Sequence, residues 1–161
     1  MPILHLQYSG QIQAPSGSVV PLPPANALLQ RGPVVQVTVG LGQTLAQQIT
    51  QQGGTLPQPI SGNGLIDTGA SGTCIDDAAA QQMGLPVVNT APMASASHAQ
   101  TLANVYPIQL TIAGLPISIQ APQAMGAALA AQGLLVLIGR DVLQHCTLHY
   151  NGLTGQITLA I

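Results

Sequence analysis

The sequence has no lysine, glutamate, phenylalanine or tryptophan, and only two arginines and four aspartates in 161 residues. A formal net charge of −2 without a basic cluster excludes a nucleic-acid-binding surface, which needs grouped lysine and arginine to displace counterions. It also argues against a partner at a charged membrane surface. Chemistry that depends on carboxylates must therefore use Asp67, Asp76, Asp77 or Asp141.

Long apolar runs are also missing. The longest, residues 134–138, is too short to span a bilayer. Residues 1–10 lack the basic start and the apolar stretch of a secretory signal. We therefore expect a cytoplasmic protein, and since thiols stay reduced there, Cys74 and Cys146 are predicted to be buried free thiols.

The patterning predicts an all-β protein, mainly β with two or three short helices, and a core of aliphatic side chains. Residues 1–33, rich in proline and glutamine, predict an extended arm or linker, and residues 34–161 predict one domain. Helices are expected over 41–52, 78–83 (capped by Asp76 or Asp77) and 122–132. Strands are expected over 34–39, 103–112, 116–120 and 134–138, with a terminal hairpin of 147–150 and 156–159.

Residues 65–71 read Leu-Ile-Asp-Thr-Gly-Ala-Ser. Two apolar residues predict the end of a buried strand, from which Asp67 emerges into a tight turn. Gly69 lets the backbone approach another loop closely, and Thr68 supplies a hydroxyl for a hydrogen bond at the base of the loop. This is the loop that an aspartic protease needs.

A second motif, Leu-Ile-Gly-Arg-Asp-Val-Leu, occupies residues 137–143. It predicts a buried strand that passes beneath the aspartate loop, where Gly139 removes a side chain that would block the crossing. With both motifs, residues 34–161 resemble the retropepsin-like (retroviral-type) aspartic proteases, and the small bacterial single-domain members most. The resemblance implies the retropepsin-like acid protease fold, closed by homodimerisation. It also implies a catalytic Asp67, an active-site loop supported by Thr68, Gly69, Ala70 and Ser71, and a loop crossing made by Ile138, Gly139 and Arg140.

The chain has one Asp-Thr-Gly loop, whereas peptide hydrolysis by general acid and base needs two carboxylates. The resemblance therefore implies an endopeptidase in which each subunit of a homodimer contributes Asp67, with water as the nucleophile and no cofactor. Extended, mainly hydrophobic peptides are the expected substrates, bound beneath a flap near residues 92–104. The candidate substrate contacts are Cys74, Ser95, Ala96, Ser97, His98 and Val136.

Ser71 stands where retroviral enzymes commonly have an acidic partner for their arginine. Arg140 is therefore expected to pair with Asp76, Asp77 or Asp141, or with backbone carbonyls. This departure and a flap tip without glycine leave an alternative function open: a catalytically silent dimeric peptide-binding module. The spacing of His145, Cys146 and His149 suits zinc ligands, but a fourth ligand is not evident nearby, and no metal is expected.

Overall fold

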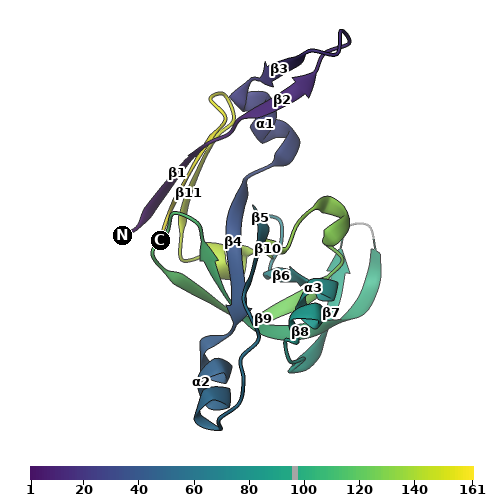
Figure 1. Ribbon diagram of the computed structural model, residues 1–161, viewed down its shortest axis with the longest axis vertical. Coiled ribbons are helices and arrows are strands. Elements are labelled where there is room, and N and C mark those ends of the chain that lie inside the picture. Colours follow the sequence, from purple (N-terminus) through teal and green to yellow (C-terminus); the bar gives the residue numbers. More distant parts are fainter. Residues whose placement is uncertain (96–97) are drawn as a thin grey trace.

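The computed structural model describes residues 1–95 and 98–161. Its main sheet has the strand order β4-β5-β10-β6-β9-β8-β7, and an additional pairing of β4 with β8 closes all but β7 into a barrel (Figure 1). The strands are β4 (Val34–Leu41), β5 (Ile60–Ile66), β6 (Cys74–Asp76), β7 (Asn89–Ser95), β8 (His98–Ile112), β9 (Ser118–Ala127) and β10 (Val136–Ile138). The class is mainly β, as predicted.

The barrel interior is aliphatic, in keeping with the absence of phenylalanine and tryptophan. On β4, alternate residues Val35, Val37 and Val39 are buried, as the period of two in a strand requires. Tyr106 on β8 is the largest fully buried side chain. Its hydroxyl group therefore needs a hydrogen-bond partner inside the protein.

A smaller sheet joins the two ends of the chain. Its order is β1-β12-β11, from β1 (Ile3–Gln7), β11 (Thr147–Asn151) and β12 (Gln156–Ala160). The expected terminal hairpin is thus present as β11 and β12. The N- and C-termini lie close together, because β1 runs antiparallel to β12 (Figure 1).

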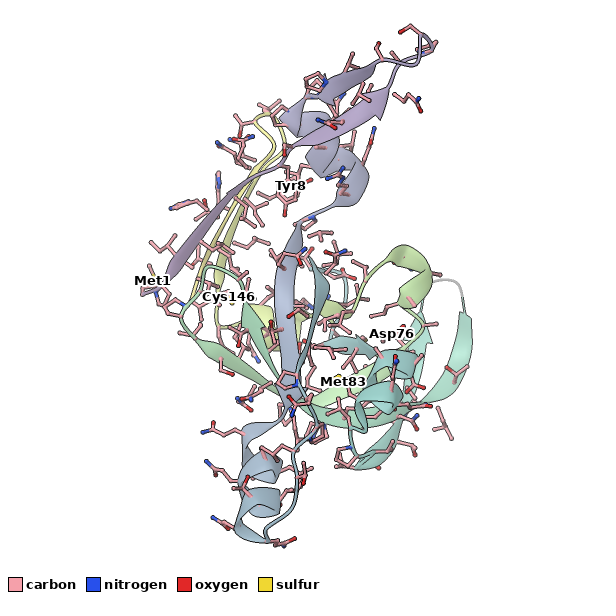
Figure 2. The ribbon with its side chains drawn as sticks, in the orientation of Figure 1. Met1, Tyr8, Asp76, Met83 and Cys146 are labelled. Atoms are coloured by element: carbon pink, nitrogen blue, oxygen red, sulfur yellow. The ribbon has the colours of Figure 1, made fainter. Side chains whose placement is uncertain are left out.

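The first 33 residues are folded, so the prediction of an extended arm is corrected. They form β1, the hairpin β2 (Gly10–Gln13) with β3 (Val19–Leu22), and helix α1 (Pro24–Arg31). The prolines do not prevent this, since Pro24 begins a helix, where no N–H is needed. Buried Tyr8 fastens the segment to the barrel: its hydroxyl donates to the Val34 carbonyl at 2.8 Å (Figure 2). Burial, with the charge of Tyr150, raises the pKa of Tyr8 to about 12. The domain boundary at residue 33 stays a prediction.

Two of the expected helices are present, as α2 (Gln43–Gln51) and α3 (Asp77–Met83). The last four residues of the second motif form a further short helix, α4 (Arg140–Leu143). The helix expected over 122–132 is wrong. Strand β9 continues to Ala127, and only residues 130–132 form a helical turn, of the 3-10 type. The reason is tertiary, because β9 is inserted between β6 and β8 and buries Ala121 and Ala124.

Candidate active site

Asp67 lies where β5 leaves the barrel. Its backbone N–H donates to the Ile138 carbonyl at 3.0 Å, which continues the parallel pairing of β5 with β10 by one residue. Its side chain is half-buried, and Oδ1 accepts hydrogen bonds from the N–H groups of Gly69 at 2.8 Å and Ala70 at 3.2 Å. The loop that Asp67 begins therefore orients its carboxylate.

Gly139 lies where the chain after β10 crosses beneath this loop. A Cβ atom at Gly139 would overlap the carbonyl group of Gly72 and lie 2.8 Å from the Thr73 nitrogen, closer than real Cβ atoms approach. The backbone of Gly139 donates to Thr73 Oγ1 at 3.2 Å, and that of Arg140 donates to the Ala70 carbonyl at 3.0 Å. Direct contact of the two backbones therefore excludes any side chain at residue 139.

Arg140 holds the loop from the other side. Its Nη1 donates to the carbonyls of Thr68 and Gly69, each at 2.9 Å. Of the partners that the sequence left open, Arg140 therefore binds backbone carbonyls and not Asp76, Asp77 or Asp141. Ser71 is exposed, and the loop is held without a carboxylate at that position.

Thr73 and Asp141 form a further link that the sequence reasoning missed. Thr73 is fully buried, and its Oγ1 donates to Asp141 Oδ1 at 2.8 Å. The same oxygen accepts from the Val142 N–H at 2.9 Å. Threonine at the start of a fully buried strand was an available signal, since a buried hydroxyl needs a partner.

Asp76 caps the start of α3, and its carboxylate is held by backbone N–H groups (Figure 2). Its Oδ1 accepts from the Ala79 N–H at 2.9 Å, and its Oδ2 from the N–H groups of Leu129 at 2.9 Å and Ala130 at 2.8 Å. Burial by itself raises the pKa of this carboxyl, but the three backbone hydrogen bonds outweigh it and hold the pKa below the ordinary value. The residue caps the helix, as expected, and also fastens the turn after β9.

The lowered pKa of Asp76 predicts an acid-sensitive contribution to stability. Ionised Asp76 stabilises the fold above the aspartate pKa of about 3.9, and this stabilisation is lost as pH falls through the lower folded value. We expect Asp76→Asn to reduce the free energy of unfolding by about 2 kcal/mol at neutral pH, and by less in acid. Urea unfolding of both proteins between neutral pH and pH about 3 measures the difference. A difference that does not change with pH would contradict the assignment.

An apolar row lies on the same face of the sheet as Asp67. Leu65, Leu137, Cys74 and Met125 are successive register partners across β5, β10, β6 and β9. Residues two apart in a strand point to the same side, so the row and Asp67 share a face. Met93 on β7 packs into the same cluster. The sequence reasoning missed these leucines and methionines, although Leu65 and Leu137 alternate with the buried Ile66 and Ile138.

Cys74 is the buried member of the row, with 7% of its surface exposed. Burial first, and then the charges of Asp141 and Asp67, raise the pKa of its thiol. A thiol that stays protonated is a poor nucleophile, which agrees with a packing role. Cys74 and Cys146 are both free thiols, as expected, but only Cys74 is buried; Cys146 is half-buried, so the prediction of a buried thiol is wrong there.

The other candidate substrate contacts have different outcomes. Val136 is fully buried in the main core, on the opposite face of β10 from Leu137, so the structure does not support a contact between its side chain and a substrate. Ser95 ends β7 and His98 begins β8, in a hairpin where the flap was expected. Ala96 and Ser97 lie outside the described residues.

Residues 1–95 and 98–161 contain neither a candidate metal site nor a helix that could span a membrane. Within these ranges no group of three or more histidine, cysteine, aspartate or glutamate side chains is arranged to hold a metal ion. Within them, too, every helix is too short or too polar to cross a membrane.

The mainly β barrel, with an aspartate loop crossed by an Ile-Gly-Arg segment, has the arrangement that the resemblance to retropepsin-like aspartic proteases implied. The model of the gag-polyprotein putative aspartyl protease family matches residues 60–145, more than half of the chain, and the chain belongs to this family. A solved retropepsin-like aspartic protease from Rickettsia conorii is similar, with 13% sequence identity and a TM-score of 0.41. The similarity covers 78% of this chain and 90% of that one. No curated protein matches the sequence.

Proposed function

We propose that the protein is an aspartic endopeptidase that hydrolyses extended, mainly hydrophobic peptides. Water would be activated between two Asp67 carboxylates, one from each subunit of a homodimer. The observation that carries the proposal is the half-buried Asp67 carboxylate, oriented by Gly69 and Ala70 on a loop whose neighbours Thr68 and Gly69 are exposed. Membership of an aspartyl protease family supports it.

The need for a second chain follows from the other three aspartates. Asp76 accepts three backbone hydrogen bonds, Asp77 accepts from Tyr106 and Asn104, and Asp141 accepts from Thr73. Since each is engaged in holding the fold, the second carboxylate is proposed to be Asp67 of another copy. The exposed Thr68 is proposed to form hydrogen bonds at the base of the two loops.

The chemistry is general acid and base catalysis. Two carboxylates a few ångströms apart share one proton. The ionised one takes a proton from water, whose oxygen attacks the peptide carbonyl carbon, while the protonated one donates to the carbonyl oxygen. The carboxyl group that took the water proton then donates it to the nitrogen of the tetrahedral intermediate. As the C–N bond breaks and the amine leaves, the other carboxylate takes a proton from a hydroxyl group of the intermediate, and a carboxylic acid forms. No acyl-enzyme forms and no cofactor takes part.

The apolar row supports the proposed preference for hydrophobic substrates. Leu65, Leu137, Met93 and Met125 are partly buried on the face of Asp67, so a substrate side chain would bury apolar surface against them. Methionine side chains adapt to different shapes, which favours a range of apolar residues over a single one. Cys74 is proposed to close the base of this surface.

The proposal also includes the extent of the catalytic unit and the compartment in which the protein acts. Residues 34–161 are proposed to carry the catalytic unit, and the family match at residues 60–145 lies within it. A cytoplasmic site of action is proposed from the sequence alone.

The proposal is tested by incubating the purified protein with a mixed peptide library from acidic to near-neutral pH. We expect cleavage beside hydrophobic residues with a bell-shaped pH dependence, because only the singly protonated pair of carboxylates is active. Inhibition by chelators or thiol reagents would contradict the mechanism. Peptide binding without cleavage at any pH would instead indicate the silent binding module.

A further inference from the structure

A second structural carboxylate, that of the half-buried Asp77, joins α3 to β8. Its Oδ1 accepts from the hydroxyl of Tyr106 at 2.8 Å and from Asn104 Nδ2 at 3.0 Å. Its Oδ2 accepts from Gln81 Nε2 at 2.7 Å, one turn along the helix. Gly126 on β9 lies against it so closely that a Cβ atom there would overlap Asp77 Oδ1.

The place of this junction in the fold is specific. Between Val105 and Thr111, β8 pairs with β9 as part of the barrel, whereas residues 98–105 pair with β7 in the hairpin. Val105 is the residue at which the pairing with β7 ends and the pairing with β9, on the other edge of β8, begins. Tyr106 follows it directly, and the pairing with β9 shifts register between Tyr106 and Ile108. The Asp77 carboxylate therefore holds β8 at the point where the hairpin leaves the barrel.

The junction is also tied to the candidate active site. Asp77 follows β6 directly, and β6 carries Cys74 of the apolar row. At the other end, Met93 of the hairpin packs against the cluster that contains Cys74 and Leu65. The orientation of the β7–β8 hairpin over the row thus depends on how β8 leaves the barrel.

We propose that Asp77 is a positioning residue: through Tyr106 and Asn104 it sets the orientation of the β7–β8 hairpin over the apolar row beside Asp67. The effect expected on the cleavage of peptides rests on the proposed function. The effect expected on the hairpin itself does not. Asp77 itself does not touch the substrate.

The test uses Tyr106→Phe, which removes one hydroxyl group and keeps the buried ring. Hydrogen exchange of the amides in β7 and in residues 98–105 is expected to become about tenfold faster, the factor that corresponds to one lost hydrogen bond. KM for a cleaved peptide is expected to rise by a similar factor of about ten, while kcat changes less. Asp77→Ala should reproduce both effects. Asp77→Asn keeps an acceptor oxygen, so its hairpin exchange and its KM should stay close to those of the wild type.

Two control variants separate positioning from general destabilisation. Gln81→Ala removes a hydrogen-bond partner of Asp77 that lies on α3 and not on β8. Ile157→Val removes a buried methylene group from β12 of the small sheet, far from the junction in the chain, and should lower the free energy of unfolding. Neither should accelerate hairpin exchange selectively. Equal exchange in Tyr106→Phe and Ile157→Val would overturn the inference. If the wild type cleaves no peptide, the proposed function fails, whereas hydrogen exchange still decides whether Asp77 positions the hairpin.

Discussion

Replacing Asp67 by asparagine is expected to lower peptidase turnover by about 10²- to 10⁴-fold, the usual contribution of general acid and base catalysis. Asparagine has nearly the same shape as aspartate, and its Oδ1 can still accept from Gly69 and Ala70 as Asp67 does. The loop should therefore persist while the ability to take a proton from water is lost. The measurement is kcat/KM on a peptide selected from the library, with thermal unfolding and sedimentation to compare fold and dimer.

Mixing the two proteins tests the origin of the second carboxylate. If each active site needs Asp67 from both chains, an equal mixture of wild type and Asp67→Asn should have, after subunit exchange, about a quarter of the activity of the same total amount of wild type. Half of the activity would indicate that each chain works alone. Near-normal turnover of the pure variant would remove Asp67 from the mechanism.

Gly139→Ala is expected to have the largest effect on stability, about 3 kcal/mol, at the upper end for over-packing in a protein interior. The backbone of Gly139, with φ −85° and ψ −179°, is one that alanine adopts readily, so the cost is steric. The added methyl group would meet the backbone of Gly72 and Thr73, which cannot rotate away as a side chain can. Chemical denaturation measures the change.

Gly40→Ala is the matched control. This glycine is also buried in the barrel, but a Cβ atom there would lie 3.6 Å from its nearest neighbours, Gln109 and Pro59, which is ordinary van der Waals contact. We expect a change of less than about 1 kcal/mol. Equal stability of the two variants would show that the crossing beneath the Asp67 loop is not as tight as the structure has it.

Local patterns in the sequence determined several parts of the protein. Three elements were predicted correctly: the strand over residues 34–39, the helix at 78–83 with its aspartate cap, and the terminal hairpin. The aspartate loop and the Ile-Gly-Arg segment were also recognisable, because each is a short run of adjacent residues. Where a few neighbours in the chain dictate the conformation, the sequence is sufficient.

Other features depended on residues far apart in the chain. Residues 122–132 have the composition of a helix, yet pairing with β6 and β8 makes most of them a strand. The partner of Arg140 had several candidates, and only the approach of α4 to the Asp67 loop selected the carbonyls of Thr68 and Gly69. The contact of Asp77 with Tyr106 likewise joins residues separated by 29 positions. Contacts of this kind form only when the barrel closes, and tertiary structure therefore decided them.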